Sequence, residues 1–132
     1  MKRVINIPSK LEHISLIEKT IDEITENLIL SPDVYGKVLI ASIEGVNNAI
    51  VHGNKQDENK SVIVELFADK SKITITIKDQ GPGFDPNCIP DPTKPENLEN
   101  ISGRGVFLMK KLSDKIEFEN NGSTVIMHFN IV

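Results

Sequence analysis

The sequence has little cysteine, little arginine and no long apolar run, and each shortage narrows the class of protein. The single cysteine, Cys88, cannot form an internal disulfide or a cysteine-based zinc site, which favours a reducing compartment. Only two of the 15 basic residues are arginines and the net charge is -4, so no direct nucleic-acid binding is predicted. The chain also lacks the roughly eighteen consecutive apolar residues of a membrane span and the apolar core of a signal peptide. We therefore expect a cytoplasmic protein that does not bind membranes.

What is present is an ordinary globular composition. Hydrophobic residues make up 39% of the 132 residues and charged residues 26%, which argues against disorder. A chain of this length buries a core of its own, so we expect one domain over residues 1–132.

Helical periodicity is found in three segments. Ser9 and Glu12 have the spacing of a capping box, and apolar residues then recur at helical spacing to about residue 29. A second helix is predicted from Ser31-Pro32, with Ser31 as its N-cap, to Gly53. Its buried face is expected to comprise Leu39, Ile43, Val46 and Ile50. A short third helix should open within residues 102–106.

Alternation of apolar and polar residues predicts strands in the rest of the chain. The expected strands are residues 3–7, 61–68, 72–78, 115–119 and 123–131, the last two joined at Asn120-Asn121-Gly122. Three amphipathic helices can cover one face of such a sheet. The fold class is therefore predicted as α+β, a two-layer sandwich whose antiparallel or mixed sheet is covered on one face by three helices.

The second predicted helix contains the first of three segments that break the local rules, and such breaks often mark functional residues. Glu44 and Asn48 lie one helical turn apart, and Gly45 between them is a poor helix former. A solvated polar face would explain this pair. A carboxylate for proton abstraction beside an amide oxygen suited to a hard cation would explain it as well.

The second break, Asp79-Gln80-Gly81-Pro82-Gly83, comes directly after the strand predicted at residues 72–78. A turn accounts for one glycine and one proline. A carboxylate followed by Gly81 and Gly83 also suits a flat ligand that closely approaches the backbone, because aspartate can accept a hydrogen bond from an exocyclic amine.

The third break is Ser102-Gly103-Arg104-Gly105, at the expected start of the third helix. Bare backbone N–H groups at a helix N-terminus can bind phosphate, although these glycines have the spacing of neither a Walker A loop nor a dinucleotide motif. The proline-rich segment of about residues 86–102 precedes them and has the length of a lid over a binding site.

Together and in this order, three motifs resemble those of the GHKL ATPase superfamily, whose members share the Bergerat ATP-binding fold. The motifs are Glu44-x-x-x-Asn48, Asp79-x-Gly81-x-Gly83 and Gly103-x-Gly105. The resemblance covers nearly the whole chain. Within the superfamily, residues 42–53, Thr93-Lys94-Pro95-Glu96 and residues 102–105 are most similar to the anti-sigma factor serine/threonine-protein kinases.

This resemblance implies ATP and Mg²⁺ as cofactors. It implies that Asn48 holds the Mg²⁺ and that Glu44 is the general base for the attacking hydroxyl. It also implies that Asp79 binds the adenine amino group, with Thr124 supporting it through a water.

The glycines and one arginine of the motifs receive roles by the same resemblance. Gly81 and Gly83 would let the backbone approach the base, and Gly103 and Gly105 would let the lid fold over the phosphates. Arg104 is a further candidate for phosphate contact.

The function implied is a kinase that phosphorylates a serine or threonine of a STAS-type anti-sigma antagonist, sequesters a sigma factor and forms a homodimer. The same motifs would equally serve a nucleotide-dependent partner-binding module without phosphotransfer. The catalytic half of a histidine kinase is less favoured, because only about thirty residues precede the second predicted helix.

Overall fold

The structure is a computed structural model that describes residues 1–26, 28–82 and 101–131. Its strands are β1 (Lys2–Pro8), β2 (Ser61–Ala68), β3 (Lys72–Lys78), β4 (Lys115–Glu119) and β5 (Thr124–Asn130). Its α-helices are α1 (Ile14–Glu26), α2 (Pro32–Asn48) and α3 (Ile101–Leu112). Shorter helical turns are η1 (Leu11–His13), the π-helical turn η2 (Ala49–Gly53) and η5 (Asn120–Gly122).

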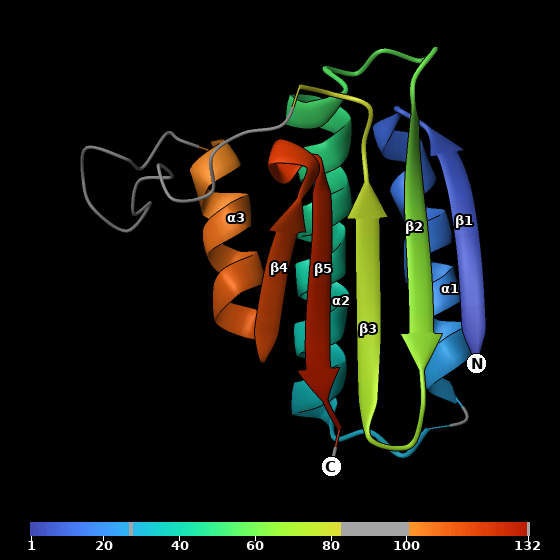
Figure 1. The fold of residues 1–132 in the computed structure, drawn as a ribbon. Coiled ribbons are helices and arrows are strands. Elements are labelled where there is room, and N and C mark those ends of the chain that lie inside the picture. Colours follow the sequence, from blue (N-terminus) through green and yellow to red (C-terminus); the bar gives the residue numbers. More distant parts are fainter. Residues whose placement is uncertain (27, 83–100, 132) are drawn as a thin grey trace.

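The five strands form one sheet in the order β1-β2-β3-β5-β4, and every neighbouring pair is antiparallel. The helices lie on one side of this sheet, with α1 behind β1 and β2, α2 behind the middle of the sheet and α3 near the edge strand β4 (Figure 1). The predicted α+β sandwich is confirmed. Of the two sheet types that the sequence left open, the described strands form the antiparallel one.

The core lies between the sheet and the helices. The strict alternation of β3 turns Ile73, Ile75 and Ile77 toward the helices, where each is at most 2% exposed. From α1, Ile17, Ile21 and Ile24 meet the core at the spacing of successive turns. None of the described helices is long and apolar enough to cross a membrane.

The buried face of α2 differs in part from the prediction. Val46 and Ile50 are fully buried, but Leu39 and Ile43 are only half-buried. The residues that face the sheet instead are mostly small: Val38, Ala41, Ser42 and Gly45.

Small residues on α2 allow the helix to lie close to the sheet. A Cβ built on Gly45 would lie 2.5 Å from Ile77 Cδ1 and 3.1 Å from Met109 Sδ, so a larger side chain there would force these two core side chains to move. The close approach also buries the Ser42 hydroxyl completely, without a hydrogen-bond partner among the described residues. Hydrophobic periodicity alone gives no weight to residues this small.

The two predicted helix caps have different outcomes. Ser31 caps α2 as predicted, since its hydroxyl accepts a hydrogen bond from the Val34 N–H at 3.2 Å. The capping box at Ser9 is wrong, because Lys10 is the N-cap residue of η1 and no side chain caps it. The Ser9 hydroxyl instead donates to the Lys60 carbonyl at 2.7 Å, a partner 51 residues away that local spacing cannot reveal.

Candidate functional site

Three of the predicted site residues meet where α2 packs against α3. Glu44 is half-buried and Asn48, one turn later on α2, is 8% exposed. A Cβ built on Gly105 would lie 3.4 Å from Glu44 Oε2 and 3.6 Å from Asn48 Oδ1. Because glycine leaves this volume free, the two side-chain oxygens face bare backbone of α3 across a small gap.

These two oxygens are suitable ligands for a hard cation. Within the described residues, no hydrogen bond of the Glu44 carboxylate or of the Asn48 side-chain amide is found, and neither group is among the fully enclosed unpaired polar atoms. Carboxylate and amide oxygens are ligands that Mg²⁺ accepts. The described residues contain no cluster of three or more His, Cys, Asp or Glu side chains that could hold a metal alone. The donor set therefore fits Mg²⁺ bound mainly through the phosphates of a nucleotide.

A second group of predicted residues meets beyond the end of β3, at the end of the molecule where α2 also ends (Figure 1). The Asp79 N–H donates to the Ser123 carbonyl at 3.0 Å, which extends the pairing of β3 with β5. The Gly81 N–H donates to Asp79 Oδ1 at 2.8 Å and turns the chain back over the carboxylate.

Close backbone contact fixes the place of this turn. A Cβ built on Gly53, the last residue of η2, would lie 2.5 Å from Asp79 Cγ. A Cβ built on Gly81 would lie 2.0 Å from the Gly53 carbonyl oxygen, which is backbone that cannot swing aside. Two glycines therefore bring the end of η2 and the turn after β3 into direct contact.

The Asp79 carboxyl is held in an environment that disfavours its charge. Burial raises its pKa above the ordinary value of 3.8, while the Gly81 N–H and the positive charge of Lys60 partly oppose this shift. Its second oxygen, Oδ2, has no hydrogen-bond partner among the described residues. A half-buried acceptor of this kind gains most from a ligand that donates a hydrogen bond.

The π-helical turn η2 joins the two groups of residues. Its last hydrogen bond runs from the Asn54 N–H to the Ala49 carbonyl at 2.8 Å, so the turn contains one residue more than an α-helical turn. Asn54 itself is 1% exposed, and its side chain bonds to three segments of the chain. Sequence reasoning missed it, since an asparagine after a glycine at a helix end is an ordinary terminator.

Thr124 is the remaining predicted site residue whose surroundings the structure describes. It pairs with Lys78 at the start of β5 and is 4% exposed. Its hydroxyl accepts a hydrogen bond from Asn120 Nδ2 at 3.2 Å. Gly83 and the predicted lid up to residue 100 lie outside the described residues, as do the side-chain environments around Gly103 and Arg104 in the first turn of α3.

The comparisons with known proteins identify the family. The family described as histidine kinase-like ATPase domain matches residues 7–129, nearly the whole chain. The chain belongs to this family. The predicted GHKL membership is therefore confirmed.

Relatives of this ATPase domain carry kinase names. The serine-protein kinase RsbW of Staphylococcus aureus, in strains JH9 and Newman among others, is 30% identical over 131 residues, covering 92% of this chain and 81% of the relative. A solved structure of the RsbU and RsbW domains of Rv1364c from Mycobacterium tuberculosis superposes with a TM-score of 0.63 at 10% identity. That superposition covers 98% of this chain and 32% of the other, and at this identity it shows the shared fold.

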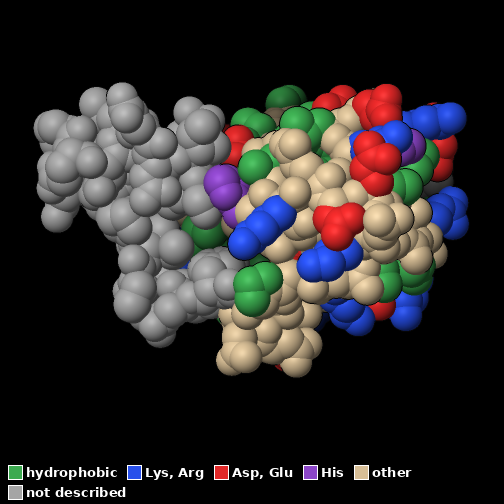
Figure 2. Space-filling model, turned by 90° about the horizontal axis from the view of Figure 1, so that it is seen from above, with side chains coloured by type: hydrophobic (Ala, Val, Ile, Leu, Met, Phe, Trp, Pro, Cys, Tyr) green, Lys and Arg blue, Asp and Glu red, His purple; other side chains and the backbone are tan. Residues whose placement is uncertain are grey.

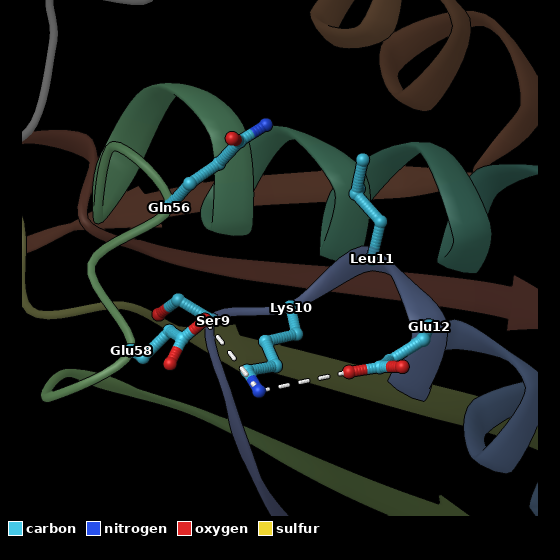
Figure 3. A pocket seen from close by; sticks show the side chains of 6 residues that line it. All are labelled: Ser9, Lys10, Leu11, Glu12, Gln56 and Glu58. Carbon is cyan, nitrogen blue, oxygen red and sulfur yellow. Dashed lines mark ion pairs between the residues drawn. The ribbon is translucent and has the colours of Figure 1, made fainter.

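At the end of the ATPase domain where α2 and β3 end, basic and acidic side chains are interspersed rather than grouped by sign (Figure 2). A hollow of about 290 Å³ lies beside η1, lined by Ser9, Lys10, Leu11, Glu12, Gln56 and Glu58 (Figure 3). Lys10 Nζ already forms ion pairs with Glu12 at 3.8 Å and Glu58 at 3.5 Å. None of the predicted site residues lines this hollow.

Proposed function

We propose that this chain is an ATP-dependent protein-serine/threonine kinase. Its substrate would be a serine or threonine of a STAS-type anti-sigma antagonist, and it would sequester a sigma factor as a cytoplasmic homodimer. The observation that carries the proposal is the gap before Gly105, faced by both Glu44 Oε2 and Asn48 Oδ1. The names of the serine-protein kinase relatives support it.

In this proposal, Glu44 and Asn48 act on the phosphates and the attacking hydroxyl. Asn48 Oδ1 would hold Mg²⁺, which when bound neutralises the charge of the ATP phosphates. The Glu44 carboxylate would accept the proton of the substrate hydroxyl. Little covalent chemistry is required of the protein in phosphoryl transfer, so positioning and charge neutralisation account for most of the acceleration.

Asp79 and the neighbouring glycines would bind the base. The Asp79 carboxylate would accept a hydrogen bond from the adenine amino group, and Gly81 and Gly83 would let the backbone approach the ring. Gly103, Arg104 and Gly105 would contact the phosphates at the N-terminal turn of α3, where backbone N–H groups and the helix dipole favour anions.

The test begins with calorimetric titration of ADP and ATP, with and without Mg²⁺, on the wild type and Asp79→Asn. Binding that Mg²⁺ strengthens and that Asp79→Asn abolishes is the expected result. Transfer of labelled γ-phosphate to a STAS-type protein is then measured. Binding without transfer would replace the kinase with a nucleotide-dependent partner-binding module. The absence of binding at millimolar nucleotide would overturn the proposal.

A further inference from the structure

The buried side chain of Asn54 holds three segments of the chain together. Its Nδ2 donates to Ser9 Oγ at 2.9 Å and to the Ser61 carbonyl at 3.0 Å. Its Oδ1 accepts from the Gln80 N–H at 2.7 Å. One amide thereby links the end of β1, the start of β2 and the turn after β3, with both of its donor hydrogens and its acceptor in use.

The hydrogen bond from the Gln80 N–H to Asn54 fixes the peptide unit directly after Asp79. Gln80 stands between Asp79 and Gly81, which itself packs against the Gly53 carbonyl. The side chain of Gln80 contributes a second link, since its Oε1 accepts from the Ser61 N–H at 2.6 Å. Gln80 is exposed, however, whereas Asn54 is buried and is fixed by its two other hydrogen bonds.

We propose that Asn54 is a positioning residue for base recognition, which fixes the direction of the Asp79 carboxylate through the Gln80 N–H. This inference rests on the proposed hydrogen bond between Asp79 and the adenine amino group. A rigid acceptor discriminates strongly between a ligand that donates to it and an analogue that does not, because the analogue leaves the acceptor unpaired. Asn54 therefore controls the preference for adenine over a base that lacks the amino group.

The test compares the affinities of ADP and inosine diphosphate, whose base carries an oxygen in place of the amino group. We expect the wild type to prefer ADP by about tenfold or more. In Asn54→Ala that ratio should fall close to one, mainly through weaker ADP binding. The phosphotransfer rate at saturating ATP should change by less than about threefold, because Glu44 and Asn48 lie on α2, whereas Asn54 follows the turn η2.

Ser9→Ala is the matched control. It removes the bonds of the Ser9 hydroxyl to Asn54 Nδ2 and to the Lys60 carbonyl, but leaves the bond between Asn54 and Gln80 in place. We expect a comparable loss of thermal stability and an unchanged ratio of ADP to inosine diphosphate affinity. An equal fall of the ratio in both variants would mean general loosening and would overturn the inference.

The outcomes separate this inference from the proposed function. If the wild type shows no preference for ADP, the adenine role of Asp79 fails, and this inference fails with it. If the wild type discriminates and folded Asn54→Ala discriminates equally, only the role of Asn54 is refuted.

A measurement on the wild type covers the case in which Asn54→Ala does not fold. Amide hydrogen exchange at Gln80 should be slower than at Lys70, an exposed residue of the turn between β2 and β3, by about tenfold or more. Exchange at Gln80 as fast as at Lys70 would show that Asn54 does not hold this turn.

Discussion

Two regions at the same end of the molecule differ in how far the protein itself determines their geometry. We call Gly53, Asp79 and Gly81 the base end, and Glu44, Asn48 and Gly105 the phosphate end. The base end is fixed by hydrogen bonds and by contacts that leave no room for a Cβ. At the phosphate end, the described residues show no hydrogen bond that fixes the Glu44 or Asn48 side chain, and Gly105 leaves the volume of a Cβ free beside them. Recognition is therefore preorganised at the base end, whereas the phosphate end is completed by what binds there.

The largest expected effect is on catalysis at the phosphate end. Glu44→Gln keeps the shape of the side chain but removes the proton acceptor, so phosphotransfer should fall by about 10²- to 10⁴-fold. The dissociation constant for ADP should stay nearly unchanged, because the base end is untouched. Transfer of labelled phosphate and calorimetric titration check the two effects. Transfer at the full rate would remove Glu44 from the mechanism.

The next effect is on stability at the base end. Gly81→Ala places a Cβ 2.0 Å from the Gly53 carbonyl oxygen, so the backbone must shift. We expect the free energy of unfolding to fall by about 3 kcal/mol, at the upper end of overpacking effects. Urea denaturation measures this change.

Gly36→Ala is the matched control for that substitution. Gly36 lies within α2 and has nothing within 4 Å of its Cβ position, so alanine should raise the free energy of unfolding by about 0.5–1 kcal/mol. Equal destabilisation by both substitutions would contradict the idea that contact at Gly81 is special.

A third prediction concerns pH and Asp79. Burial raises the pKa of this carboxyl in the folded state, so its contribution to stability is present below pH 3.8 and is lost as the pH rises through the folded-state pKa. Asp79→Asn keeps an acceptor for the Gly81 N–H and removes the charge. The variant should therefore be more stable than the wild type at pH 7, with the difference shrinking toward pH 3, although it loses ADP binding. Thermal melts across this pH range, without nucleotide, test the sign.

The smallest effect is expected inside α2. Ser42 is fully buried and its hydroxyl has no partner among the described residues, so Ser42→Ala should raise the free energy of unfolding by about 1 kcal/mol. Ser42 belongs to neither the base end nor the phosphate end, so the affinity for ADP should be unchanged. Glu44 is only two residues away in sequence but lies on another side of the helix. A loss of stability would reveal an unrecognised partner for the hydroxyl.

Most of the fold could be predicted from local patterns. Three correctly predicted features depend only on residues close in sequence: the alternation of residues 72–78, the turn at Asn120-Asn121-Gly122 and the cap at Ser31. The predictions that failed involve contacts between residues distant in sequence. The Ser9 hydroxyl bonds to Lys60 instead of capping a helix, and α2 meets the sheet through small residues that hydrophobic periodicity does not detect.

The candidate site divides in the same way. Glu44, Asn48 and Asp79 attract notice because they stand among glycines where a helix or strand would favour other residues. Asn54 has no such local signal, since its role arises only when segments 45 and 26 residues away are brought beside it. The place of Thr124 depends on strand register, which the sequence of one strand does not determine.

The bonds of Asn54 also bear on the order of folding. The hairpins β2–β3 and β4–β5 join neighbours in sequence, so little loop entropy opposes their early formation. Asn54 can make its bonds only after the first strand, the helical layer and the end of β3 have assembled around it. The ability to bind a base should therefore be among the last properties that the refolding chain acquires, and a nucleotide present at that stage would select fully folded molecules from those with only a formed sheet.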